Sequence, residues 1–571
     1  MSTLDGVDEP AIQFDRVPQD LPAHNAMIPL GFREIGDRDC DVDPAKRRGL
    51  YPRAKQVPRA KGNSMRQTLA GLVLTVLVVA CGGSSDPNTA AYWIERLEKK
   101  ETRVEALKKL GDLKDKSAIP AVLEYLGKEG EWQPDAAFAL GQLGDPAVVP
   151  QLVAKIDFGA GGGADKTTRI KNRVNQNVVR ALAMLKAPEG VDPMVKLINA
   201  ADDRTREAAM MALGDMGDKR ATEPLVQVAT TDRAPFMRRV AITSLGALAD
   251  AKAAPALIKM LFVEIPGASF YNEARFALIQ IGQPAVPKLL ETLRRENKEI
   301  EEIRMGDGSP VAPGAVEAKI SSVLGALRVK DAEPIMLKAL ETHYKSFQGR
   351  EKEPVHAAVL GAIIEVAYAL GNIGTDTGLK ALIALAKDPE INVRIATSEA
   401  LTTLGSPTAV PALLEAAKTG ELDSKRAALS AASRLGTGDH LAAFDALGKD
   451  ATLAPFVQAE RVRLVAASEC KAELACWKKK LEDADPKVRE RAAYQLGWLG
   501  AKDASAELLK AAQDNDAFVR MGAVLSIDRL GNTDPAALQA VYDAGKNRME
   551  FRAVNSEIQR IVASLKARSR K

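Results

Sequence analysis

The sequence contains few aromatic residues. Aromatic side chains make up 4% of the 571 residues, whereas hydrophobic residues as a whole make up 46%. A hydrophobic core must therefore consist mainly of Ala, Leu and Val. Side chains of that size suit close packing of one helix on another, and sheet-rich folds usually contain more aromatic and β-branched residues. The composition therefore favours an all-α fold.

Cysteine and histidine are also scarce. The four cysteines are too few for a disulfide scaffold and too dispersed for a four-ligand zinc site; they are Cys40, Cys81, Cys470 and Cys476. No histidine is followed by Glu and no two lie four residues apart, which excludes the His-Glu-x-x-His zinc motif. A Gly-x-Ser-x-Gly elbow and a phosphate-binding loop are absent as well. The sequence therefore predicts no catalytic residue, metal site or cofactor.

An excess of charge of either sign is missing. Lys and Arg number 79 and Asp and Glu 75, which leaves a net charge of +4 over the whole chain. A nucleic-acid-binding protein usually carries a clear basic excess or stripe. The charge balance therefore argues against a nucleic-acid partner.

Only one long apolar run is present, Leu69–Ala80. Its 12 residues fall short of the ~20 that a helix needs to cross a bilayer, but they match the core of a signal peptide. Met65 and Arg66 precede the run, and Cys81 follows it directly. The alternatives are a buried helix or an ordinary cleaved signal with a chance cysteine.

The end of this run, Val78-Val79-Ala80-Cys81, resembles the lipobox of bacterial lipoproteins. The resemblance implies cleavage between Ala80 and Cys81 and attachment of a diacylglyceryl group to the Cys81 thiol. Two or three acyl chains anchor a protein stably in a membrane. Gly82 is not the Asp that the family associates with retention in the inner membrane. We therefore expect a periplasm-facing lipoprotein of the outer membrane, with the inner membrane or the cytoplasm as alternatives.

The position of this signal divides the chain. Residues 1–64 hold seven prolines and show no helical or alternating apolar period, so they are predicted to be disordered or to precede the true start at Met65. A cytoplasmic tail before an uncleaved anchor is the alternative. Residues 65–80 are then the signal peptide, 81–89 a lipidated tether and 90–571 the folded part.

One pattern recurs through the folded part. Its clearest copies, such as Ala139–Gly144, Ala212–Gly217 and Gln495–Gly500, place a Leu-Gly pair before a second apolar residue and a Gly. Aligned copies give 13 units with a base period of about 31 to 33 residues and three longer gaps. Such a period is typical of repeat proteins that stack one supersecondary unit on the next.

Each unit reads as a helical hairpin. The first helix carries apolar residues at spacings of three and four, such as Val519, Ala523 and Ile527, and ends at a Gly suited to a left-handed conformation. The second helix often begins with Pro, which is tolerated in a first turn; examples are Pro120, Pro224, Pro255, Pro287 and Pro411.

These features resemble HEAT repeats from about residue 90 to 570, and the short period is most similar to the subclass named after phycobilisome lyases. An Asp followed by an apolar–Arg pair, such as Asp516 and Val519-Arg520, belongs to the same resemblance. It implies an all-α, right-handed α-solenoid of about 13 hairpins. It also implies a scaffold for protein partners, or, as an alternative, a lyase-like or chromophore-handling enzyme.

The longer gaps predict loop inserts near residues 157–169, 296–314 and 343–354, each after a second helix. Such inserts line one edge of a solenoid, where they either bind ligands or are merely tolerated. The concave groove is expected to be built from the second helices. The recurring arginines are predicted to bond to Asp or carbonyl groups of adjacent turns rather than to form an anion-binding groove; they are Arg206, Arg238, Arg394, Arg489 and Arg520.

Two cysteines fall within one unit. Cys470 ends a first helix and Cys476 lies early in a second helix, so the hairpin could bring them together. An oxidising periplasm would permit a disulfide, and two reduced core thiols are the alternative. The last residues, 546–571, are predicted to form a long basic helix that caps the array, with attraction to anionic lipid as the alternative.

These observations predict a lipid-anchored scaffold of the bacterial envelope that binds protein partners and is not an enzyme. A structural spacer without a specific partner is a further alternative. The identity of the partner does not follow from the sequence.

Overall fold

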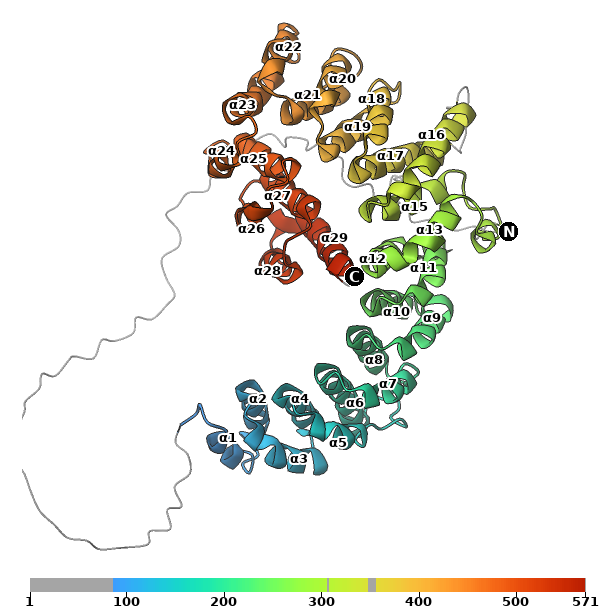
Figure 1. The fold of residues 1–571 in the computed structure, drawn as a ribbon. Coiled ribbons are helices and arrows are strands. Elements are labelled where there is room, and N and C mark those ends of the chain that lie inside the picture. The colour runs from blue at the N-terminus through green and yellow to red at the C-terminus, as the bar shows by residue number, and fades with distance from the viewer. Residues whose placement is uncertain (1–85, 306–307, 348–355, 570–571) are drawn as a thin grey trace, which may run out of the picture. The chain divides into compact units, whose positions relative to one another are not determined.

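The computed structural model describes residues 86–305, 308–347 and 356–569. Almost all of this part is helical, and the helices follow one another as antiparallel hairpins (Figure 1). The first helices of the hairpins are α2 Arg103–Leu113, α4 Gln133–Leu143, α6 Lys166–Met184, α8 Asp203–Met216, α10 Pro235–Leu248, α12 Tyr271–Ile281, α15 Ala315–Ala326, α17 His356–Ile373, α19 Ile391–Leu404, α21 Leu422–Leu435, α23 Ala454–Cys470, α25 Pro486–Trp498 and α27 Ala517–Leu530.

The second helices are generally shorter. They are α3 Ile119–Gly127, α5 Val149–Val153, α7 Val191–Leu197, α9 Thr222–Thr231, α11 Ala254–Met260, α13 Val286–Leu293, α16 Glu333–Phe347, α18 Asp376–Leu385, α20 Val410–Ala416, α22 Leu441–Ala446, α24 Leu474–Lys480, α26 Ser505–Ala511 and α28 Pro535–Gly545. Together with the first helices they make 13 hairpins within the described residues, so the prediction of an α-solenoid of about that many units is confirmed.

Three helices and one small sheet stand outside the hairpins. Helix α1 (Ala90–Arg96) precedes them, α14 (Lys298–Glu301) lies in the second predicted insert, and α29 (Arg552–Ser569) follows them. Strands β1 (Glu264–Ile265) and β2 (Ala268–Ser269) pair antiparallel between α11 and α12. None of the described helices is long and apolar enough to span a membrane.

The turns inside the hairpins explain why the repeat is so regular. In the turn between α8 and α9, Gly217 adopts a left-handed conformation, with φ of +73°, which a glycine reaches without steric cost. Asp218 then accepts a hydrogen bond from the backbone N–H of Arg220 at 3.0 Å and caps a single 3-10 turn, Lys219–Ala221. Ten of the 13 hairpins contain such a 3-10 turn, and in four of them an Asp side chain caps it.

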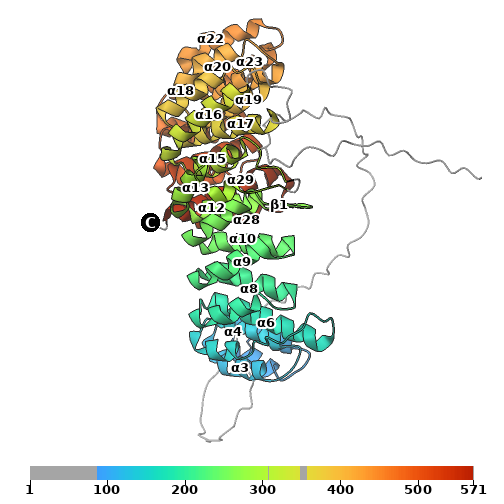
Figure 2. The same cartoon turned by 90° about the vertical axis from the view of Figure 1, so that its right-hand side faces the viewer.

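The core lies between two layers of helices. Leu and Ala side chains of the first helices pack against the second helices and are almost fully buried, as Leu140, Leu213 and Leu401 are. Figure 2 shows the hairpins stacked in successive layers. Burial of about 25 cal/mol per Å² of apolar surface stabilises each layer against its neighbours.

The first helices line the concave side of the solenoid and the second helices its convex side (Figure 1). The prediction that the second helices build the concave groove is therefore wrong. The physical reason is that the first helices pack directly on each other, whereas the second helices make few contacts with one another, so the array curves toward the first helices. We call the first helices inner and the second helices outer.

The array consists of two parts of different curvature. From α2 to α11 the hairpins form an open arc, whereas from α12 to α29 they curl until α29 packs against α12 (Figure 1). We call residues 103–260 the arc and residues 271–569 the ring. The predicted C-terminal helix is therefore present, but it packs against α12 as well as against its own neighbours α27 and α28.

Candidate binding surface

The inner helices share four concave positions, which follow one another at spacings of four, three and four residues. In α8 they are Arg204, Ala208, Met211 and Asp215. Such spacings place side chains on one face of a helix. Equivalent positions in other inner helices are found by counting back from the turn residue that follows each helix. We number these positions first to fourth along each helix.

In the ring the concave positions contact each other. Ser322, the third position of α15, accepts hydrogen bonds from Tyr271 at 3.2 Å and from Arg275 at 2.5 Å. The third positions of α17 and α19 also meet, because the Tyr368 hydroxyl donates to Glu399 at 2.6 Å. Burial and the nearby Glu399 raise the pKa of Tyr368. The concave face of the ring is thus occupied by its own side chains.

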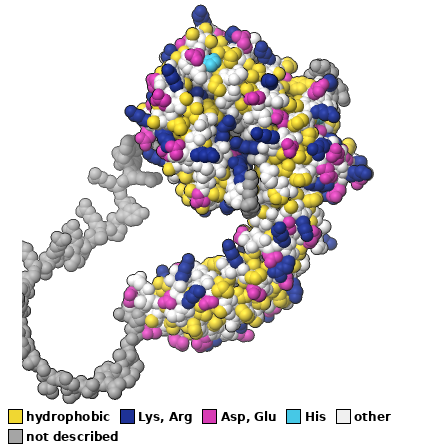
Figure 3. Space-filling view, in the orientation of Figure 1, with side chains coloured by type: hydrophobic (Ala, Val, Ile, Leu, Met, Phe, Trp, Pro, Cys, Tyr) yellow, Lys and Arg dark blue, Asp and Glu magenta, His cyan; other side chains and the backbone are white. Residues whose placement is uncertain are grey.

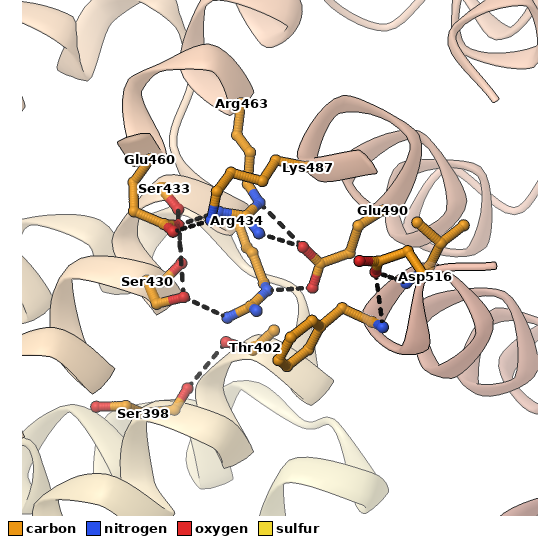
Figure 4. Close-up of polar contacts among 12 residues, drawn as sticks. Ser398, Thr402, Ser430, Ser433, Arg434, Glu460, Arg463, Lys487, Glu490 and Asp516 are labelled. Carbon is orange, nitrogen blue, oxygen red and sulfur yellow. Dashed lines mark hydrogen bonds and ion pairs between the residues drawn. The ribbon is translucent and has the colours of Figure 1, made fainter. Parts of the chain in front are cut away.

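A buried ionic network fills the ring where α21, α23 and α25 meet (Figure 4). Arg434 and Arg463 both bond to the carboxylate of Glu490, Arg434 at 2.7 Å, while Lys487 lies 2.6 Å from Glu460. Burial raises the pKa of Glu490, but the guanidiniums of Arg434 and Arg463 outweigh it and hold the pKa below its usual value. Both carboxylates are therefore ionised and fully paired, which leaves neither of them available as a general acid.

A second ionic cluster joins the two ends of the ring. Asp528 of α27 is 2% exposed and lies 3.0 Å from Arg560 and 2.6 Å from Arg568, both in α29. Arg328, which follows α15, reaches the same carboxylate at 3.4 Å. Burial raises the pKa of Asp528, but the three guanidiniums outweigh burial and hold the pKa below its usual value, so the carboxylate stays charged. One carboxylate therefore holds together segments that are 200 residues apart.

In the arc the concave positions are open. The space-filling view shows a hollow on the concave side of the arc, with hydrophobic and charged side chains on its surface (Figure 3). Three large apolar side chains are exposed there: Met184 by 44%, Met211 by 54% and Phe236 by 53%. They occupy the fourth, third and first concave positions of α6, α8 and α10. Exposed apolar clusters of this kind mark surfaces that bind a partner.

The recurring arginines do not line this surface. Arg489 donates to the carbonyl of Asp483 at 2.9 Å and forms two bonds of 2.9 Å with Asp514, and Arg238 donates to the carbonyl of Asp232 at 2.6 Å. Arg520 likewise bonds to the carbonyls of Asp514 and Asn515. Their predicted role in a ladder of structural bonds is confirmed.

A shallow apolar groove beside the hairpin turns of the arc is a second candidate surface. It measures about 760 Å³ and lies between α5 and the turn after α6, with Pro146, Val153, Leu185 and Pro188 in its walls. Helix α5 has five residues, so it leaves part of the neighbouring hairpin uncovered. Lys186 and Glu189 also line it.

Cys470 and Cys476 are joined by a disulfide, with their Cα atoms 5.3 Å apart. The bond ties the end of α23 to α24 beside Trp477, a fully buried side chain that donates to the carbonyl of Lys471 at 2.9 Å. The two residues therefore form a structural link within one hairpin.

The remaining predicted site residues cannot be followed in the part of the chain that the structure describes. Ala80 and Cys81 lie outside the described residues, and so do the segments 1–64 and 65–80. No group of His, Cys, Asp and Glu suited to a metal ion occurs within the described part of the chain. The first predicted insert is partly helical, because α6 begins at Lys166, and α16 extends into the third as far as Phe347.

Comparisons with known proteins identify the repeats. The family model for HEAT repeats matches residues 171–246, 362–433 and 475–553, and the model for the PBS lyase HEAT-like repeat matches residues 135–157 and 237–262. The predicted resemblance to HEAT repeats is thereby confirmed. No curated protein matches the chain in sequence.

Similar solved structures belong to several kinds of protein. The complex of CpcE and CpcF of phycocyanin lyase from Nostoc sp. PCC7120 is 22% identical over 35% of this chain and 79% of that chain, with a TM-score of 0.25. Kap95p, solved with RanGDP, is 14% identical over 82% of this chain and 70% of that chain, with a TM-score of 0.41. Human deoxyhypusine hydroxylase is 22% identical over 56% of this chain and 96% of that chain, with a TM-score of 0.20.

Proposed function

We propose that this chain, whose repeats match the HEAT models, is a non-catalytic scaffold that binds a protein partner on the concave face of its arc. The observation that carries this proposal is the contrast between equivalent positions. In the ring, Tyr368 and Glu399 contact each other, whereas in the arc Met211 and Phe236 remain exposed. A surface that the chain does not cover itself is available to a partner.

Photo-crosslinking in cells tests this proposal. A photoreactive amino acid in place of Met211 should give an adduct with one defined protein. The same substitution at Gln227, an exposed residue of the outer helix α9, is the matched control and should give none. Equal adducts at both positions, or none at Met211, would contradict concave binding and favour a structural spacer.

We also propose that the scaffold is anchored in the bacterial cell envelope by lipid on Cys81. The support is the lipobox-like Val78-Val79-Ala80-Cys81 after a short apolar run. Intact mass and membrane fractionation of the natively expressed protein test the anchor. A chain that begins at acylated Cys81 in the outer-membrane fraction is expected, and a soluble chain that retains residues 1–64 would contradict it.

A lyase-like enzyme is the second candidate, and Asp135 in α4 is the observation that favours it. This concave carboxylate lies 4.0 Å from both Lys108 and Arg173, and burial raises its pKa more than the two cations lower it. A carboxyl group with a raised pKa is a common general acid. If Asp135→Asn leaves the crosslinking and the cellular phenotype unchanged, the scaffold proposal is favoured.

A further inference from the structure

The exposed apolar side chains on the arc lie along a diagonal. Met184 is near the end of α6, Met211 is in the middle of α8 and Phe236 is near the start of α10. Neighbouring inner helices run parallel at about 8–10 Å spacing and rise about 1.5 Å per residue. The three side chains therefore span roughly 25 Å, which matches about 17 residues of a bound helix, close to five turns. We call them the apolar diagonal.

Four arginines lie on one side of the apolar diagonal, toward the starts of α6 and α8. Three of them follow one face of α6 at spacings of four and seven residues, and the fourth is the first concave position of α8. We call them the basic flank; they are Arg169, Arg173, Arg180 and Arg204.

The basic flank is poorly neutralised by the arc itself. Arg173 comes no closer than 4.0 Å to a carboxylate, that of Asp135, and Arg180 donates only to the amide oxygen of Asn177, at 3.0 Å. The side chains of Arg169 and Arg204 have no hydrogen-bond or ion-pair partner in the part of the chain that the structure describes. Guanidinium groups bind carboxylates with two parallel hydrogen bonds, so these four groups are suited to acidic side chains from outside.

The other side of the apolar diagonal has a different character. It carries Asp215, Thr243 and Ala247, and burial raises the pKa of Asp215 against the opposing effect of Lys566. A bound helix would thus meet four arginines along one edge, and along the other edge Asp215 with a single lysine, Lys566 of α29, near it. Two unlike edges fix the orientation of a bound helix as well as its position.

We infer that the concave face of α6, α8 and α10 binds an amphipathic helix of a partner protein whose apolar stripe is flanked by acidic residues. This inference rests on the proposed scaffold function and specifies the chemistry of the partner. The apolar stripe packs on the apolar diagonal, and acidic side chains along one edge pair with the basic flank. Helices that bind in grooves commonly use such spaced apolar anchors.

Two synthetic peptides test the inference against the full chain. Both have about 18 residues and the same apolar stripe, but one has Glu and the other Lys along its flanks. Fluorescence anisotropy should show that the Glu peptide binds at least tenfold more tightly than the Lys peptide. Added salt should weaken the binding, because the arginines are exposed to solvent.

Variants of the chain locate the binding. Arg173→Glu combined with Arg204→Glu should weaken binding of the Glu peptide at least tenfold and should strengthen binding of the Lys peptide. Met211→Ser should weaken both. The matched control combines Arg220→Glu and Arg461→Glu, two exposed arginines outside this face, and should leave both affinities unchanged. Tighter binding of the Lys peptide would also show that the first double variant still folds.

The inference is overturned if the two peptides bind alike, if neither binds, or if the basic-flank variant leaves the affinity for the Glu peptide unchanged. Crosslinking from Met211 separates this failure from that of the proposed function. A defined adduct without binding of the Glu peptide would support the scaffold function and contradict the acidic helix as the partner. Loss of both would discard the scaffold as well.

Discussion

The arc and the ring are built from the same hairpin, but they use its concave face in opposite ways. In the ring, the third concave positions of α17 and α19 contact each other, because Tyr368 donates to Glu399 at 2.6 Å. In the arc the corresponding face carries exposed Met211 and Phe236. The same face of the hairpin is therefore occupied by the chain's own side chains in the ring and left open in the arc.

The largest expected effect comes from Asp528→Asn. It leaves Arg328, Arg560 and Arg568 around a neutral side chain, and loss of one partner from a buried ionic cluster costs about 3–5 kcal/mol. Hydrogen exchange should show loss of protection in α29 and α12 with α6 and α8 unchanged. Asp203→Asn, at a side chain that is 74% exposed, is the control and should have little effect. Equal loss of protection in the arc would mean that the two parts unfold together.

Acid should weaken the ring through Glu460. Burial raises the pKa of this carboxyl, but Arg463, Lys487 and Arg434 outweigh it and lower the pKa from 4.5 to about 2. The carboxylate therefore adds stability that is complete above about pH 4.5 and is lost as the pH falls toward 2, as much as about 3 kcal/mol. Urea unfolding at pH 7 and pH 3 should show a smaller difference for Glu460→Gln than for the unchanged chain.

In the arc, the ionised carboxylate of Asp135 should affect stability in the opposite direction. The pKa of Asp135 is raised, so its ionised form disfavours folding at neutral pH and its protonation favours it. Asp135→Asn should therefore leave the stability at pH 7 unchanged or higher. A strong loss would show that its contacts with Lys108 and Arg173 matter more than burial.

A pair of glycines measures how tightly the ring is closed. Gly282 in the ring has a φ of +75° and an added Cβ would lie 2.9 Å from Ala567 of α29, whereas Gly217 in the arc has a φ of +73° and nothing within 4 Å. Gly217→Ala should cost about 1 kcal/mol from backbone strain alone. Gly282→Ala should cost at least about 2–3 kcal/mol, since its ψ of −139° lies outside the left-handed helical region that Gly217 occupies and the close contact adds. Equal melting temperatures for the two variants would contradict a tight contact between α12 and α29.

Reduction of the disulfide should have a smaller effect, confined to the ring. Opening a short loop between Cys470 and Cys476 removes about 2 kcal/mol in the chain-entropy account. Thermal unfolding with and without a reductant checks this value. Cys476→Ser should melt at the lower temperature under both conditions, and a reductant-sensitive variant would show that another cysteine is involved.

Met211→Ser should change the stability little. The side chain is 54% exposed, so its replacement should change the free energy of unfolding by less than about 0.5 kcal/mol. The same variant is expected to weaken partner binding. A large loss of stability would place Met211 in the core and remove it from the binding surface.

The sequence predicted the hairpins because their signals are local. A left-handed Gly, a capping Asp and an early Pro each act within a few residues, and the apolar period of the helices is equally short-ranged. Closure of the ring was not predictable in this way. The contact between Arg328 and Asp528 depends on small rotations summed over many hairpins, which no single repeat reveals.

The binding surface was missed for a related reason. Met184, Met211 and Phe236 are apolar residues outside the core period, and this is a signal that the sequence contains. The meaning of this signal depends on knowing that the first helices line the concave side, whereas the sequence led us to place the second helices there. The strands β1 and β2 and the helix α14 were missed because they lie in connections without a repeat period.

Packing of α29 against α12 also bears on the order of folding. A ribosome releases α12 nearly 300 residues before α29, so the ring cannot close until almost all of its residues have been synthesised. The arc is held mainly by contacts between neighbouring hairpins and can form while the chain is still growing. Until α29 arrives, the inner face of the ring is exposed, and in that interval it presents a surface that a chaperone could protect.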